Sequence, residues 1–157
     1  MSYSTILAEI KAELNAIIPT DTDNFATIGN VHDYVRVQDN DATRVTFLKS
    51  GATCPEWFLS LANREPDLSE VGTLEGRQYE CLLRGYYPVN DGIESEKLFL
   101  ILIEDILNHF EYEDTLDHNV WTMRPPALSR FESVSIMLDG KYVHYCEIRF
   151  RPYQYAT

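Results

Sequence analysis

The chain lacks the features that mark membrane, secreted and disordered proteins. Its longest uninterrupted apolar run is six residues, Leu98 to Ile103, whereas a membrane-spanning helix needs about 20. Seven glycines and seven prolines are too few for a low-complexity chain. The opening stretch, MSYSTILAEIKAELNAI, carries acids among its apolar residues and no basic leader, which is unlike a signal peptide. The composition therefore predicts a single globular domain, residues 1–157, with a core of its own.

Basic residues are scarce. Thirteen Lys and Arg stand against 25 Asp and Glu, which gives a formal net charge of −12. A surface that grips nucleic acid needs the opposite balance. An acidic protein can still surround DNA, because repulsion lets a polyanion slide without sticking. The charge by itself indicates only a soluble acidic surface.

Cysteines and catalytic motifs are few or missing. Cys54, Cys81 and Cys146 are odd in number and form no CxxC pair, which suits a reducing compartment better than a disulfide framework. The chain contains no GxGxxG, Walker or HExxH pattern. Gly85 lies inside a predicted strand, where a single glycine indicates a bulge or a close backbone approach. We therefore expect no catalytic residues and no cofactor, and the chemistry of the chain by itself does not name a function.

The stretch SEKLFLILIEDILNHF, Ser95 to Phe110, is predicted to be the central helix. Projected at about 100° per residue, its polar residues cluster on one side. The opposite side is one apolar stripe of Phe99, Leu102, Ile103, Ile106, Leu107 and Phe110. A cap is expected at Asp91 or Ser95. Leu98 and Ile101 lie off the stripe beside Glu104, either as ordinary exposed aliphatics or as a subunit contact.

The first half of the chain predicts a helix and two strands before its longest connection. Tyr3 to Ile17 forms a helix, with Ala8, Ala12 and Ala16 along a side where a second helix could come close. Val31 to Val37 is predicted to be a strand, and Ala42 to Ser50 a short helix, with a strand through Val45 and Phe47 as the alternative. A second strand contains Trp57, Leu59 and Leu61, and the acidic connection from Asn63 to Gly76 follows it.

The second half predicts a strand from Arg77 to Val89 and, after the central helix, a hairpin from Phe131 to Phe150. A two-residue turn at Asp139-Gly140 would place Val134 and Ile136 opposite Val143 and Tyr145. A three-residue loop that includes Leu138 makes a single apolar face, so it is the favoured register. Side chains expected to point away from that face are Glu147, Arg149 and Arg151.

These elements, in the order αβαββαββ, predict an α+β domain of two layers. The expected sheet has about five mostly antiparallel strands, with two or three helices packed on one face.

Several residues could belong to a metal or nucleophile site, but each group is incomplete. His32-Asp33 is a dipeptide that metal phosphohydrolases use, yet neighbours on a strand point to opposite faces. His109, Asp117 and His118, or His144 with Cys146, could supply zinc ligands. Zinc needs three or four ligands, however, and only His144 and Cys146 are placed on one strand face by their spacing. We therefore predict no metal site, and expect Cys81 and Cys146 to be buried thiols without a neighbouring base.

Three segments carry a resemblance to a known family. They are IGNVHDYVR at 28–36, RQYECLLRGYY at 77–87 followed by DGIESEKLF at 91–99, and DGKYVHYCEIRF at 139–150. In order and spacing they resemble the tail terminator proteins, also called tail-completion or neck proteins, of tailed bacteriophages. The matching segments are spread over nearly the whole chain. The sequence departs from the family pattern at Ala42 to Ser50, where a helix with a tryptophan would be expected.

The resemblance implies a non-enzymatic α+β virion protein that forms a homo-oligomeric ring, typically a hexamer. Such a ring ends polymerisation of the tail tube and provides the surface that joins the head. The implied partners are the tail tube protein and the head-closure or portal-side neck proteins, with DNA passing through the lumen without specific binding and no membrane. The implied location is the virion neck, after assembly in the host cytoplasm.

A closed ring needs two different complementary patches on each subunit. The candidate interface residues are Leu98, Ile101, Glu104, Arg149 and Arg151. Two alternatives stay open: another connector of the phage neck, and a small ligand- or metal-binding α+β domain that uses His32, Asp33 or His144.

Overall fold

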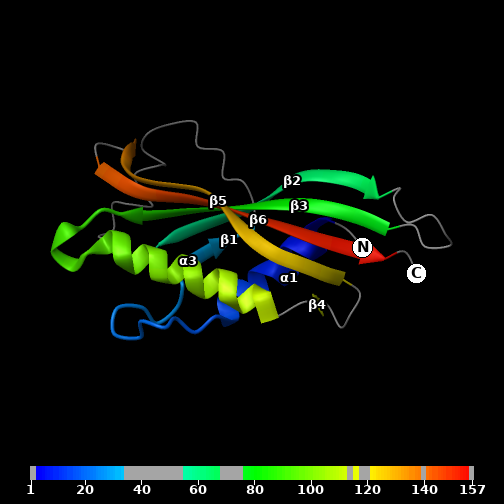
Figure 1. The fold of residues 1–157 in the computed structure, drawn as a ribbon, viewed down its shortest axis with the longest axis horizontal. Coiled ribbons are helices and arrows are strands. Elements are labelled where there is room, and N and C mark those ends of the chain that lie inside the picture. Colours follow the sequence, from blue (N-terminus) through cyan, green and yellow to red (C-terminus); the bar gives the residue numbers. More distant parts are fainter. Residues whose placement is uncertain are drawn as a thin grey trace.

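The computed structural model describes residues 3–33, 55–67, 76–112, 115–116, 121–138 and 141–155. Within this part of the chain, two helices lie on one face of a twisted six-stranded sheet, in the strand order β1-β2-β3-β6-β5-β4 (Figure 1). β1 runs parallel to β2, and all other neighbours are antiparallel. The α+β, two-layer prediction is confirmed, with one short strand more than the five expected.

The elements have the following bounds. The helical ones are α1 (Tyr3–Ala16), the 3-10 turn η1 (Asp91–Ile93) and α3 (Ser95–Tyr112). The strands are β1 (Asn30–His32), β2 (Glu56–Asp67), β3 (Gly76–Pro88), β4 (Thr115–Leu116), β5 (Trp121–Leu138) and β6 (Lys141–Tyr155).

Helix α1 follows its predicted periodicity. Ile6, Ile10 and Leu14 are buried against the sheet, as the 3.6-residue spacing requires. The predicted close approach of a second helix along the alanines is wrong, because Ala8, Ala12 and Ala16 are all exposed. Helix α3 contacts α1 at another position, where His109 on α3 bonds Glu13 in the C-terminal half of α1 at 2.9 Å.

Helix α3 buries the predicted stripe, and five of its six members are at most 2% exposed: Phe99, Leu102, Ile103, Ile106 and Phe110. The placement of Leu98 off the buried surface is wrong, since it is only 9% exposed and belongs to the core. At the first turn of α3, the surface that packs on the sheet is therefore wider than the predicted stripe. Ile101 is half-buried, at the boundary between the core and solvent.

The predicted cap of α3 is also wrong. Asn90 caps the preceding 3-10 turn by accepting a hydrogen bond from Gly92 N. Glu94, in a left-handed conformation with φ 54°, then offers its carbonyl to Lys97 N and Leu98 N. Ser95 does not cap the helix, because its hydroxyl points inward to other partners that are described below.

Strands β2 and β3 have the predicted faces but a longer ladder. Their side chains alternate as expected, and the inward-facing ones are Trp57, Leu59, Tyr79, Cys81, Leu83 and Tyr87. The predicted connection from Asn63 is wrong up to Asp67, because pairing continues past a bulge until Asp67 meets Gly76. The strand continues from Asn63 to Asp67 because its backbone groups form hydrogen bonds with β3. The polar side chains of this segment, which resemble those of a loop, do not end the strand.

The hairpin of β5 and β6 has the register that we did not favour. Leu138 pairs with Lys141, which makes a two-residue connection, and Ile136 lies opposite Val143. A register shift between Ser133 and Ile136 then brings Phe131 opposite Cys146. The change of register is therefore absorbed inside β5 and not in the turn, an option that turn chemistry alone does not reveal.

Some predictions fall on residues outside the described part of the chain. They concern the strand beyond Asp33, the helix from Ala42 to Ser50, Cys54, and the pair Asp117 and His118. Within the described residues, no helix is long and apolar enough to cross a membrane.

Candidate functional site

The sheet face opposite the two helices carries polar and aromatic side chains. On β6 they are Tyr145, Glu147, Arg149 and Arg151, which confirms that the last three point away from the core face. Cross-strand pairing places Arg130 beside Glu147 and Glu132 beside Tyr145. Paired positions in a sheet share a face, so these four side chains lie together on one surface of β5 and β6.

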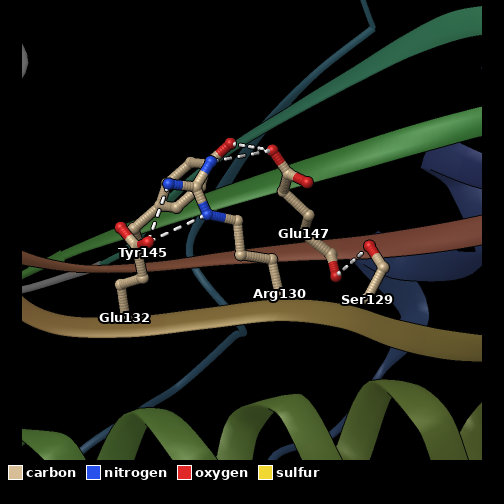
Figure 2. A network of polar contacts seen from close by, with 5 residues as sticks. All are labelled: Ser129, Arg130, Glu132, Tyr145 and Glu147. Atoms are coloured by element: carbon tan, nitrogen blue, oxygen red, sulfur yellow. Dashed lines mark hydrogen bonds and ion pairs between the residues drawn. The ribbon is translucent and has the colours of Figure 1, made fainter.

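Figure 2 shows the polar network on this surface. Arg130 Nη2 and Nε lie 2.7 and 3.1 Å from Glu132 Oε1, while Arg130 Nη1 lies 3.9 Å from Glu147 Oε1. Tyr145 donates its hydroxyl hydrogen to Glu147 Oε1 at 2.6 Å. Ser129 donates to the backbone carbonyl of Glu147 at 3.1 Å, which secures β5 to β6. The network holds Arg130 at a set position on the surface.

The guanidinium of Arg130 also lies over the ring of Tyr145, 5.4 Å from its centroid. This cation–π contact adds to the orientation of Arg130. Burial, followed by the hydrogen bond to Glu147, raises the pKa of Tyr145, so the phenol stays protonated as a donor. The phenol of Tyr145 therefore acts as a hydrogen-bond donor in this network and not as an ionised nucleophile.

A second pair of an arginine and a glutamate lies farther along the same face. Arg149 on β6 bonds Glu80 on β3. The side chain of Arg149 remains 45% exposed and that of Arg130 remains 49% exposed, and Arg151 is exposed two residues farther along β6. Three guanidinium groups, Arg130, Arg149 and Arg151, therefore face solvent from two adjacent strands; we call them the arginine patch.

The same face has an aromatic row toward the β1 edge. His32 stacks on Phe58 at 5.0 Å between ring centroids, Phe58 meets Tyr86 at 5.9 Å, and Tyr86 meets Tyr145 at 5.0 Å. The buried carboxylate of Glu56 contacts His32 Nε2 and Asn30 Nδ2, both at 2.8 Å. These contacts fasten the short parallel strand β1 to β2.

The candidate metal pairs have other partners. Asp33 faces Lys11 at 3.6 Å, while His32 bonds Glu56, so the dipeptide does not act as one chelating unit. His109 bonds Glu13. Over the described ranges, no group of three or more His, Cys, Asp and Glu side chains is arranged to hold a metal ion.

His144 is the centre of a buried polar junction that the sequence did not reveal. Its Nε2 lies 2.7 Å from Ser95 Oγ, and its Nδ1 lies 2.7 Å from Ser133 Oγ. Ser95 Oγ also accepts the backbone N–H of Asn90 at 2.8 Å. The junction thus joins the start of α3 to β6 and β5.

A serine next to a histidine could suggest nucleophilic catalysis, but this junction has a different geometry. Ser95 and His144 are each only 2% exposed, so a substrate has no access to the hydroxyl. The second ring nitrogen bonds a hydroxyl, whereas a catalytic histidine is usually oriented by a carboxylate or amide. Burial lowers the pKa of His144 and keeps the ring neutral. We assign the junction a structural role.

The thiols of Cys81 and Cys146 are buried, as predicted. Burial raises the pKa of each to about 12. Because the thiolate is the reactive form, neither thiol suits nucleophilic or redox chemistry at neutral pH.

The structure divides the candidate interface residues between the two sides of the subunit. Leu98, Ile101 and Glu104 belong to α3, on the helical face, with Leu98 in the core and Glu104 exposed. Arg149 and Arg151 lie on the opposite face of the sheet. The two groups therefore do not form one patch.

Sequence reasoning missed Arg130 as a member of the arginine patch, and it missed the partners that orient the patch: Glu80, Glu132 and Tyr145. The alternating charges of R-F-E at 130–132 and of Y-C-E-I-R at 145–149 were the available signal. It becomes informative only after the pairing of β5 with β6 is known.

Searches for known relatives identify no family: neither the protein-family models nor the curated proteins include a match to this chain.

Proposed function

We propose that this chain is a non-enzymatic virion protein, a tail terminator that forms a ring at the head-proximal end of a phage tail tube. The observation that carries the proposal is the resemblance of segments 28–36, 77–87, 91–99 and 139–150 to that family. In the fold these segments include β1, most of β3, the first turn of α3 and most of β6. They thus contribute to both layers of the domain.

The two chemically different sides of the subunit support assembly into a ring. A two-fold dimer uses one self-complementary patch, whereas a ring joins one patch to a different one on the next copy. This subunit presents an acidic helix on one face and arginines on the other. Six copies, the usual number in the family, is the expected size.

The net charge of −12 also supports the proposal. A lumen through which DNA passes should repel phosphate groups, so that the polyanion is not retained. The partners that follow are the tail tube on one side of the ring and the portal-side neck proteins on the other.

Another connector of the phage neck would use the same kind of ring, and binding to polymerised tail tube or to portal complex separates the two assignments. No described contact favours a metal-binding domain, because His32, Asp33 and His144 are engaged with other side chains.

Native mass spectrometry combined with negative-stain electron microscopy tests the proposal. We expect closed rings, either of the purified chain at high concentration or of the chain added to purified tail tubes. A chain that stays monomeric under both conditions would rule out the proposed function.

The variant Ile101→Glu gives a sharper test. Placing a charge on this half-buried position should leave a folded, soluble subunit that no longer forms rings. Ile93→Glu is the matched control, because Ile93 is 47% exposed on the 3-10 turn before α3. Rings of Ile101→Glu as stable as those of Ile93→Glu would remove Ile101 from the interface.

A further inference from the structure

Charge is distributed very unevenly between the two faces of this subunit. Segments 3–33 and 91–111, which include both helices, contain eleven acidic residues and only two basic ones, Lys11 and Lys97. The described side chains of the opposite sheet face are balanced, with Arg84, Arg130, Arg149 and Arg151 against Glu56, Glu80, Glu132 and Glu147. Two copies that met through their helical faces would therefore bring like charges together.

The outer surface of α3 combines acids with partly covered aliphatic side chains. Ile101, Glu104, Asn108 and Glu111 recur at spacings of three and four residues, so they form one stripe along the helix. Glu104, Asn108 and Glu111 are exposed, and Ile101 is half-buried. We call these four residues the outer stripe.

The arginine patch has the complementary chemistry. A guanidinium carries five N–H donors in a rigid fork, and the bonds from Arg130 to Glu132 use only part of this capacity. The bonds to Glu132 and Glu80 orient Arg130 and Arg149 before any partner arrives. Such pre-ordered arginines lose little side-chain entropy when they bind a carboxylate.

We propose that the outer stripe of α3 on one copy docks on the arginine patch of the next copy. This inference rests on the proposed function and names the two surfaces that meet in the ring. Glu104 and Glu111 of one subunit then face the guanidinium groups of its neighbour, and Ile101 packs on the aliphatic stems of the arginines. The two surfaces are different patches of the same subunit, as a head-to-tail contact between identical copies requires.

Charge reversal tests the pairing. Glu104→Arg places a cation against the arginine patch, and Arg151→Glu places an anion against the outer stripe. Each variant by itself should weaken the contact by about tenfold or more, because like charges then oppose each other across the interface. Asp23→Arg is the matched control for Glu104→Arg, since it makes the same change of charge in the exposed loop after α1.

An equimolar mixture of Glu104→Arg and Arg151→Glu provides the decisive measurement. In a ring that alternates the two variants, every contact again joins opposite charges, so native mass spectrometry should detect mixed rings. Retention of rings in both separate variants, or no recovery in the mixture, would overturn the pairing. The pairing would also be overturned if Arg151→Glu still formed rings and lost only affinity for a DNA oligonucleotide. Absence of rings in the wild-type chain, even on tail tubes, would instead contradict the proposed function.

Discussion

The indole ring of Trp57 lies against the backbone of Gly85 on the neighbouring strand. A Cβ atom placed on Gly85 would come within 2.3 Å of Trp57 Cζ3 and 2.9 Å of Cys146 Sγ. Trp57 is fully buried, and its Nε1–H donates to the carbonyl of Ile28 at 2.8 Å. The ring is therefore held both by packing and by a buried hydrogen bond.

Gly85→Ala should therefore destabilise the fold. Overpacking of a filled core typically costs about 1–3 kcal/mol, and we expect a loss in the free energy of unfolding at or above this range, measured by urea denaturation. Gly92→Ala is the control, because its Cβ would meet only Asn90 Oδ1 at 3.3 Å on an exposed turn. Equal losses in the two variants would show that Trp57 can move aside.

Ser95→Ala should destabilise the protein by about 1–3 kcal/mol, because it leaves the Asn90 N–H and a ring nitrogen of buried His144 without their partner. Ser129→Ala removes a hydroxyl of the same kind from an exposed site, where substitutions usually change stability by less than about 0.5 kcal/mol. Denaturant midpoints of the two variants give the comparison. A Ser95→Ala variant as stable as Ser129→Ala would contradict the structural role of the junction.

Stability should fall as the pH is lowered below about 6.5, the ordinary pKa of histidine. Burial lowers the pKa of His144 in the folded protein, so in this range the unfolded chain binds more protons than the folded one. The contribution of neutral His144 to the free energy of unfolding is fully present above pH 6.5. The loss of this contribution stops growing below the lowered pKa of His144. Urea midpoints between pH 5.5 and 7.5 should therefore change more in the wild type than in His144→Gln. Parallel curves for the two proteins would exclude His144 as the source.

Cys81 and Cys146 should resist alkylation in the native protein at pH 8. Their pKa values of about 12 leave almost no thiolate, and both side chains are fully buried. Peptide mass spectrometry after iodoacetamide treatment distinguishes these sites from Cys54. Modification should become complete when guanidinium unfolds the chain. Rapid native labelling at either site would mean that the core opens readily.

The elements whose location followed from the sequence are those with a strong local period. The stripe of α3 and the alternation of β3 and β6 depend only on the repeat of a helix or a strand, so spacing along the chain was sufficient. A bulge or a close backbone approach was also expected at Gly85, and the structure shows the close approach. The sequence did not identify Trp57 as the side chain that lies there. Arg149 and Arg151 were assigned correctly to the outer face for the same periodic reason.

The elements that sequence reasoning placed wrongly depend on partners far away in the chain. Leu98 is buried because the start of α3 is held on the sheet by the bonds from Ser95 to His144. The polar end of β2 is a strand because β3 supplies a matching ladder. The register of the hairpin depends on a bulge in β5, which no turn motif encodes.

The sequence by itself determined which side chains share a face along the stripe of α3 and along β3 and β6, that the domain combines helices with a mostly antiparallel sheet, and that the net charge is strongly acidic. Local periodicity and composition are enough for such properties. Only the tertiary structure decided the order of the strands, the neighbours of His144 and the separation of Glu104 from the arginines onto opposite faces. These depend on contacts between distant segments, whose geometry no local pattern contains.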